Sequence, residues 1–138
     1  GAYVAAVAAF DAALAIAPGD REAALLRAQA LSWDNRQAAA AAAYQDLLAR
    51  DPADQRALLG LARVQSWRGR QRDALATLAR LPASPDDPKE AAMIAVEAHS
   101  WMGRRDRAAA AARARLAEAP GDRRAQGLLD QLARDNRH

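Results

Sequence analysis

Residues 58–70 read LLGLARVQSWRGR, and this stretch decides the fold that we expect for the chain. Leu58, Leu61 and Ala62 recur at helical spacing, which places them on one face of a helix. Gly69 is expected to end that helix, because glycine readily adopts the left-handed backbone conformation found at helix ends. Further on, the apolar positions 74, 75, 78 and 81 follow helical spacing again. The stretch therefore predicts two short helices joined by a tight turn.

The same pattern returns every 34 residues. Three Ser-Trp pairs are 34 residues apart, and each is followed two positions later by Asn or Gly. The pairs are Ser32-Trp33, Ser66-Trp67 and Ser100-Trp101, and the following residues are Asn35, Gly69 and Gly103. The pentapeptide APGDR at 17–21 also returns unchanged at 119–123, three periods later. This period is typical of helical repeat proteins, in which stacking of neighbouring units supplies the core.

Turn and capping signals predict eight helices, at about 2–17, 21–33, 36–50, 55–67, 70–81, 88–101, 104–119 and 123–135. Prolines are expected to close helices, because the residue before a proline avoids helical angles. These prolines are Pro18, Pro52 and Pro120, and the expected N-caps are Asp20, Asp54, Asp87 and Asp122. After Asp87, Pro88 takes the first helical position and Glu90 is expected to complete a capping box.

The composition favours helices and excludes several classes of site. Alanine fills 41 of the 138 positions, and only six residues are aromatic. The absence of cysteine excludes disulfides, zinc fingers and thiolate catalysis, without choosing a compartment. No apolar stretch is long enough to span a membrane, and no signal segment opens the chain. No Ser-His-Asp set, phosphate loop or metal-ligand spacing occurs, so we expect no enzyme activity, no cofactor and no metal.

The repeat resembles the tetratricopeptide repeat, a 34-residue helix-turn-helix family. The resemblance rests on a Leu-Ala pair, small residues where the helices cross, a bulky residue four positions later and a closing proline. In the central units these residues are Leu61, Ala62, Gly69, Ala74, Leu78, Ala28, Ala40, Tyr44 and Pro52. The tryptophans depart from the family pattern, because they end the first helix instead of beginning it. The resemblance implies an all-α, right-handed superhelical solenoid of antiparallel helix pairs that holds a protein or peptide on its concave face.

On this resemblance, the chain divides into a half repeat (1–20), three repeats (21–54, 55–88 and 89–122) and a capping helix (123–138). Because the first unit lacks its front half, we expect the chain to belong to a longer protein. A weaker likeness links 44–70 to repeats that precede outer-membrane β-barrels in Gram-negative exopolysaccharide exporters. That likeness implies a periplasmic scaffold of an envelope export machine, with the cytoplasm as the alternative location.

Two sets of side chains are candidates for ligand contact on the concave face. They are the Ser-Trp pairs named above and the charged residues Arg56, Arg63, Glu90 and Glu97. Indole rings at regular spacing can stack on sugar rings or on ligand side chains, and each offers one hydrogen-bond donor. In the alternative interpretation, each ring packs against the next unit. For the charges, the alternative is ion pairing between units, of Arg56 with Glu90 or of Arg63 with Glu97.

The turns form a third candidate surface, a basic edge. Its members are Arg36, Arg68, Arg70, Arg72, Arg104, Arg105 and Arg107. Successive turns of a solenoid fall on one side, so these arginines are expected to align and to suit an anionic polymer or acidic peptide. The alternative is a solvated edge without a ligand. The 17 acidic residues and the net charge of +3 argue against nucleic acid.

The internal histidine, His99, is expected to pack between helices, because Leu31 and Gln65 occupy its place in the other units. It forms no acid–base pair with Glu97, since residues two apart on a helix face different ways. The sequence therefore predicts a non-catalytic scaffold that binds a protein or peptide. Polysaccharide binding along the tryptophans and anionic-polymer binding by the basic edge are the alternatives.

Overall fold

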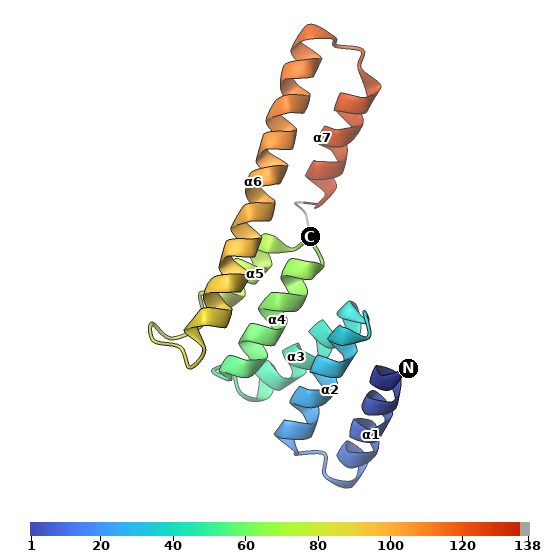
Figure 1. Cartoon of the computed structure of the whole chain (residues 1–138), viewed down its shortest axis with the longest axis vertical. Coiled ribbons are helices and arrows are strands. Elements are labelled where there is room, and N and C mark those ends of the chain that lie inside the picture. Colours follow the sequence, from blue (N-terminus) through green and yellow to red (C-terminus); the bar gives the residue numbers. More distant parts are fainter. Residues whose placement is uncertain (136–138) are drawn as a thin grey trace.

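The computed structural model describes residues 1–135 and contains seven helices and no strand within them. The helices are α1 (Ala2–Ile16), α2 (Arg21–Trp33), α3 (Gln37–Arg50), α4 (Gln55–Trp67), α5 (Gln71–Leu78), α6 (Pro88–Glu118) and α7 (Arg123–Asp135). Helices α1 to α5 form a stack, and α6 rises out of it with α7 folded back along its far half (Figure 1). The all-α class is confirmed, whereas the handedness of the superhelix stays a prediction. Of the predicted capping segment 123–138, the last three residues lie outside the described part.

Aspartates begin four of the helices, as predicted. Asp20, Asp54, Asp87 and Asp122 each accept a hydrogen bond from the backbone N–H three positions further on. Each carboxylate thereby satisfies a donor that has no partner inside the helix. The predicted capping box is wrong, because the carboxylate of Glu90 binds Arg63 on α4. The Glu90 carboxylate pairs with the Arg63 guanidinium on α4 instead of accepting from the backbone N–H of the N-cap residue Asp87.

The turns after α2 and α4 are alike in detail. Asn35 and Gly69 adopt the predicted left-handed conformation, with φ of 60° and 79°. The residue after each donates its backbone N–H to a carbonyl five positions back, at 2.9 and 2.8 Å. In both turns a glutamine side chain, Gln37 or Gln71, donates to the serine carbonyl five positions back, at 3.0 and 3.1 Å. These bonds satisfy carbonyls that the end of a helix leaves unpaired.

The third turn that the sequence predicts is absent, and that prediction is wrong. Helix α6 runs for 31 residues through Gly103, so the expected helices 88–101 and 104–119 are one helix. Within the described residues the predicted eight helices are therefore seven. Position 105 holds an arginine where the other turns have Gln37 and Gln71, and Arg105 donates to the carbonyl of Gly69 instead. Residues 104–118 are also mostly Ala and Arg, which are strong helix formers.

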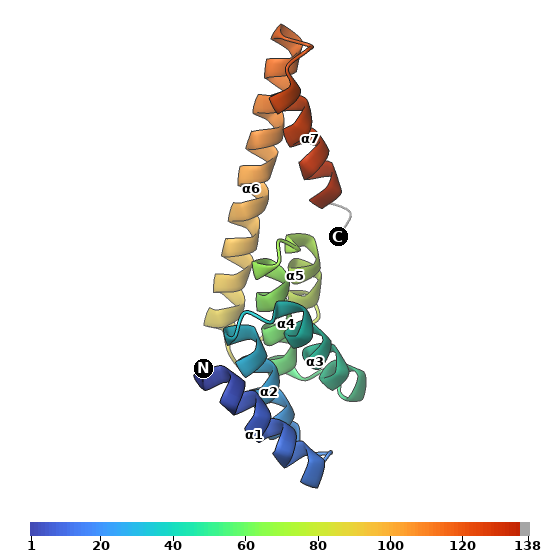
Figure 2. The same cartoon turned by 90° about the vertical axis from the view of Figure 1, so that its right-hand side faces the viewer.

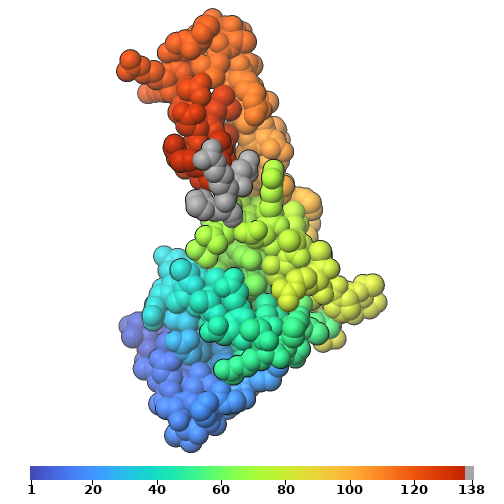
Figure 3. All heavy atoms as spheres, turned by 180° about the vertical axis from the view of Figure 1, so that it is seen from behind, coloured from blue at the N-terminus to red at the C-terminus, as the bar shows by residue number. Residues whose placement is uncertain are grey.

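The apolar core lies in the stack and not in the protruding end of the molecule. Its larger cluster surrounds Leu31, Leu58 and Val64, whose side chains are at most 1% exposed. A second cluster, of Leu59, Ala62 and Ile94, joins α4 to α6. Beyond Gly103, the buried apolar residues among 104–135 are two alanines, Ala112 on α6 and Ala125 on α7. The side view and the space-filling view both show this end standing away from the stack (Figures 2 and 3).

His99 is exposed, and the prediction that it packs between helices is wrong. Its repeat equivalent Leu31 is fully buried. The difference arises because residues 104–118, which were expected to fold back beside the segment containing His99, continue away from it in α6. No helix within residues 1–135 combines the length and the apolar character needed to cross a membrane. The division into repeats at 21–54, 55–88 and 89–122 stays a prediction.

Candidate functional site

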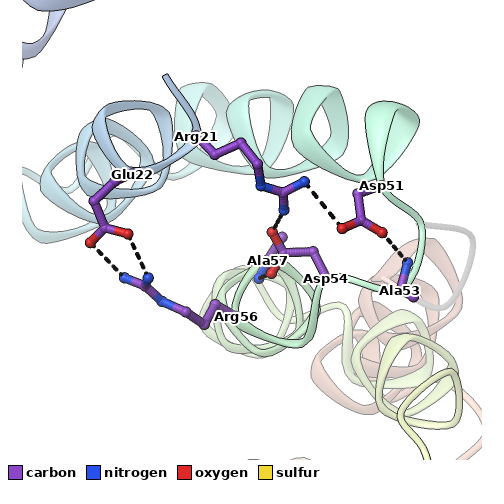
Figure 4. A network of polar contacts seen from close by, with 7 residues as sticks. All are labelled: Arg21, Glu22, Asp51, Ala53, Asp54, Arg56 and Ala57. Carbon is purple, nitrogen blue, oxygen red and sulfur yellow. Dashed lines mark hydrogen bonds and ion pairs between the residues drawn. The ribbon is translucent and has the colours of Figure 1, made fainter. Parts of the chain in front are cut away.

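An ion pair joins the first helices of two successive repeats. Arg56 on α4 donates to both carboxylate oxygens of Glu22 on α2, at 2.7 and 3.2 Å (Figure 4). The hydrogen bond between these side chains lowers the pKa of Glu22 and raises the pKa of Arg56. The predicted pairing of Arg56 with Glu90 is therefore wrong. The residues that begin α2 and α4 lie side by side, while Glu90 is occupied by Arg63.

Arg63 forms a close ion pair with Glu90 at the start of α6, and both side chains are about three-quarters buried. The predicted partner of Arg63 was Glu97, which lies two turns further along α6 and is exposed. The pair borders a shallow hollow that also receives the ring of Tyr44. Burial raises the pKa of Tyr44, so its phenol is neutral at physiological pH. Ion pairing between units is thus present, but it joins partners other than the predicted ones.

A second anchor between repeats escaped the sequence analysis. Arg21 donates to Asp51 at 3.1 Å and forms a close ion pair with Asp54 (Figure 4). Asp54 also caps α4 through the backbone N–H of Ala57, and Asp51 accepts from the N–H of Ala53 at 3.2 Å. The sequence signal was the acidic pair that brackets the α3–α4 junction. Two carboxylates held by backbone bonds at one junction form a fixed seat for an arginine.

The three tryptophans are about half exposed: Trp33 is 51%, Trp67 is 45% and Trp101 is 46% accessible. The rings have different neighbours. The ring centroid of Tyr3 on α1 lies 5.8 Å from the ring centroid of Trp33. The guanidinium of Arg104 lies 4.8 Å from the ring centroid of Trp101, which is cation–π geometry. Each ring therefore keeps surface available for a ligand, and the neighbours of Trp33 differ from those of Trp101.

Trp67 and Trp101 line one hollow, and Trp33 does not contribute to it. We call it the tryptophan hollow. Its lining includes Trp67, Trp101, Glu97, Arg68, Arg70 and Arg105, together with Leu132 and Asp135 of α7. Of the predicted ligand-contacting tryptophans, the structure therefore brings two together. Among the charged candidates, Glu97 joins them, whereas Arg56, Arg63 and Glu90 border the separate hollow beside Tyr44.

The serines of the Ser-Trp pairs do not form a uniform row. Ser32 and Ser66 are only 5% exposed. Ser66 nevertheless lines the tryptophan hollow, and contact of these serines with a ligand stays a prediction. The hydroxyl of Ser32 donates to the carbonyl of Gln29 at 2.8 Å. Ser100 is exposed. The second helix of the repeat covers the serine in the first two units, whereas in α6 the chain continues straight past Ser100.

The predicted basic edge is only partly assembled. Arg68, Arg70 and Arg105 meet in the tryptophan hollow, whereas Arg36 and Arg107 do not line it. The structure has no third turn, so Arg104, Arg105 and Arg107 lie on the continuous helix α6. A neighbouring hollow places Arg70, Arg72 and Arg105 among the carboxylates of Asp73, Asp106 and Asp135. The predicted alignment of all seven arginines on one edge is therefore wrong, because it required a turn at Gly103.

A model of the tetratricopeptide repeat family matches residues 34–95. This match supports the tetratricopeptide repeat family over that segment. The matched segment holds α3, α4 and α5 entirely and extends into the first two turns of α6. No significant match to the chain was found among curated proteins or among solved structures. The tetratricopeptide repeat is a scaffold of protein–protein interaction, which directs attention to surfaces that a partner protein could use.

Within residues 1–135, no group of three or more His, Asp or Glu side chains is placed to hold a metal ion. Several acidic side chains of this part of the chain are instead paired with arginines. The pairs of Arg21 with Asp51 and Asp54, and of Arg115 with Asp122, are examples. The arrangement at the tryptophan hollow suits binding, through two aromatic faces beside several fixed charges.

Proposed function

We propose that this chain is a protein-binding scaffold that holds an extended segment of a partner protein in the tryptophan hollow. The family supports a protein partner. The observation that carries the choice of surface is that Trp67 and Trp101 keep about half of their surface open in one hollow. Large aromatic side chains are the commonest energetic anchors of protein interfaces, because they contribute much contact area and lose little conformational entropy.

The charges around the hollow point to the chemistry of the partner segment. Arg68, Arg70 and Arg105 contribute three positive charges, against the negative charges of Glu97 and Asp135. Arg105 is already held by the carbonyl of Gly69, at 3.4 Å. Arginine binds carboxylates through paired, charge-assisted hydrogen bonds. The preferred segment therefore carries an aromatic or aliphatic side chain flanked by Asp or Glu.

Tryptophan fluorescence during a peptide titration tests this proposal. The probe is a short peptide with Leu and Phe flanked by Glu, compared with the same peptide carrying Lys in place of Glu. Trp67→Ala is expected to weaken binding of the acidic peptide about tenfold or more, as loss of an interface anchor does. Trp33→Ala is the matched control, because it removes the equivalent ring from outside the hollow and should change affinity less than about threefold.

The results distinguish the proposal from its alternatives. Absence of binding by the acidic peptide, with helicity intact by circular dichroism, would overturn it. Binding of a soluble oligosaccharide that depends equally on all three tryptophans would favour the polysaccharide alternative. Binding of both an acidic polymer and the peptide, with a steep loss as salt rises and no effect of Trp67→Ala, would favour the basic edge.

The envelope export context is a further proposal, which rests on the likeness of residues 44–70 to exporter-associated repeats. It places the chain in the periplasm, with the cytoplasm as the alternative. Cell fractionation of the full parent protein, followed by mass spectrometry of proteins that co-purify with it, tests both. Recovery with cytoplasmic markers and no envelope partner would contradict the periplasmic placement.

A further inference from the structure

A buried cluster between two repeats has an exposed counterpart one repeat further on. Leu59 and Ile94 pack together with Ala62 between α4 and α6, where they are 8%, 4% and 0% exposed. Adding 34 to each number gives Met93, Leu128 and Val96. These three are 59%, 41% and 69% exposed. The sequence repeats the apolar interface, but the chain does not assemble it.

The straight course of α6 accounts for this exposure. The first helices α2 and α4 are each covered by the second helix of their own repeat, α3 and α5. The corresponding second helix for 88–101 is 104–118, which continues α6 in the same direction. Fifteen residues of α-helix span about 22 Å. The straight helix therefore places α7 beside its far half, away from the stack (Figure 1). Residues 88–101 thus lack both of the helices that cover their equivalents.

Both missing helices lie in one preassembled unit. Residues 104–135, here called the arm, comprise the second half of α6 and α7. The two helices contact each other, and each has one buried alanine, Ala112 or Ala125. This contact is the repeat equivalent of that between α3 and α4. The bond between Arg115 and Asp122, at 2.9 Å, further ties the two helices together. The arm therefore keeps its own internal packing while its surface toward residues 88–101 stays unused.

We propose that the surface of Met93 and Val96 is covered by the arm of a second copy of this chain, and that the two copies exchange arms. Leu128 of each copy then packs on Met93 of the other, as Ile94 packs with Leu59. The arrangement is two-fold symmetric, so each copy gives and receives one arm and assembly stops at two. The contacts between the two copies would be the same as those that already join successive repeats within one chain. The arm also borders the tryptophan hollow through Leu132 and Asp135. Arm exchange is inferred without relying on the peptide-binding role proposed above.

Gly103 is the hinge in this proposal. In the two turns that do form, the equivalent residues have positive φ, whereas Gly103 lies within a helix. Glycine allows both conformations. The straight form is favoured by position 105, where arginine replaces the glutamine that supports the other turns. The choice between turn and helix at this residue therefore determines whether the arm folds onto its own chain or onto another.

Cysteine pairing tests which chain the arm covers. The chain has no native cysteine, so any disulfide that forms must join the introduced thiols. One chain carrying Met93→Cys is mixed with another carrying Leu128→Cys, unfolded together, refolded and oxidised. Arm exchange predicts a disulfide-linked heterodimer, because a disulfide forms only between thiols whose Cα atoms lie within about 7 Å. Met93→Cys mixed with Gln45→Cys, on the exposed face of α3, is the negative control.

Hinge variants test the role of Gly103, with sedimentation equilibrium as the measurement. Gly103→Ala is expected to lower the dimer dissociation constant about tenfold or more, because alanine favours helix and disfavours positive φ. Arg105→Pro is expected to give monomer. In the two formed turns, the residues before the equivalent positions 37 and 71 are Arg36 and Arg70, whose ψ angles are near 60° and compatible with a following proline. The interior of a continuous helix is not compatible with proline. Gly127→Ala, in an open site of α7, is the matched control and leaves the dimer unchanged.

Three results would overturn the proposal. The first is a wild-type chain that remains monomeric up to about millimolar concentration, the range in which weak contacts associate. The second is a dimer in which the thiols introduced at positions 93 and 128 of different copies do not join. The third is a double variant, Met93→Cys with Leu128→Cys, that forms only an intramolecular disulfide, since that result places the arm on its own chain.

Discussion

The ring of Tyr44 lies directly on the backbone of Gly60. A Cβ atom at position 60 would stand 2.3 Å from Cζ of the ring, far inside the distance at which carbon atoms touch. Tyr44 is 4% exposed, so its ring has little space into which to withdraw. A glycine in the middle of α4 is thus explained by the aromatic ring of the preceding helix, which crosses it at close range.

Gly60→Ala is therefore expected to destabilise the fold, although alanine is the better helix former. Overpacking costs about 1–3 kcal/mol, against a gain in helix propensity of about 1 kcal/mol. The free energy of unfolding, measured by urea titration with circular dichroism, should fall. Gly127→Ala is the control, because a Cβ at that helical position meets no atom within 4 Å, and stability should rise. Equal stabilisation by both substitutions would contradict the packing argument.

Gln71→Ala is expected to weaken the second turn. The Gln71 side chain is 5% exposed and donates to the carbonyl of Ser66 at 3.1 Å. Its removal leaves that carbonyl without this partner, so the free energy of unfolding should fall by about 1 kcal/mol. Gln45→Ala, on an exposed face of α3, should have no such effect in thermal unfolding. If the two variants melt together, the glutamine bond does not support the turn.

Stability of the arm is expected to depend on pH through Asp122. Arg115, and then the backbone N–H groups of Ala125 and Arg124, donate to this carboxylate and hold its pKa below the ordinary 3.8. Because the folded pKa is the lower one, the stabilisation is complete well above pH 4 and is lost as pH falls through the folded pKa. Carbon-detected NMR of the Asp122 carboxyl measures this value directly.

Arg115→Gln should raise the pKa of Asp122 towards 3.8 and reduce the loss of α7 helicity on acidification. Arg113→Gln, at an exposed position of the same helix, removes the same charge without touching the carboxylate and is the control. A pKa that is equal in both variants would show that general charge, and not the hydrogen bond from Arg115, sets the titration of Asp122.

Local signals predicted much of the fold because their causes are local. The N-cap carboxylates act on backbone groups three positions away, and Asn35 and Gly69 end their helices through their own φ angles. The candidate site was less predictable. The 34-residue period located the tryptophans, but it did not show that Trp67 shares a hollow with Trp101 while Trp33 lies beside Tyr3. These placements depend on helices distant in sequence.

The ion pairs show the same division. Arg56 and Arg63 were recognised as charges available for pairing between repeats, yet both predicted partners were wrong. A pairing depends on the crossing of neighbouring helices, since a guanidinium reaches whichever carboxylate that crossing places beside it. The packing brings Glu22 to Arg56 and Glu90 to Arg63. Sequence spacing alone shows which face of a helix a residue lies on. It does not show how far along the helix axis the residues of the neighbouring helix lie.

By itself, the sequence determined the all-α class, the repeat period, the capped helix starts and two of the three turns. Only the tertiary structure decided the course of the chain at Gly103. Local propensity favours helix on both sides of this glycine, and a turn there gains stability only if 104–118 packs against 88–101. That gain depends on contacts between segments, and in this structure the segment continues as helix, leaving Met93 and Val96 exposed.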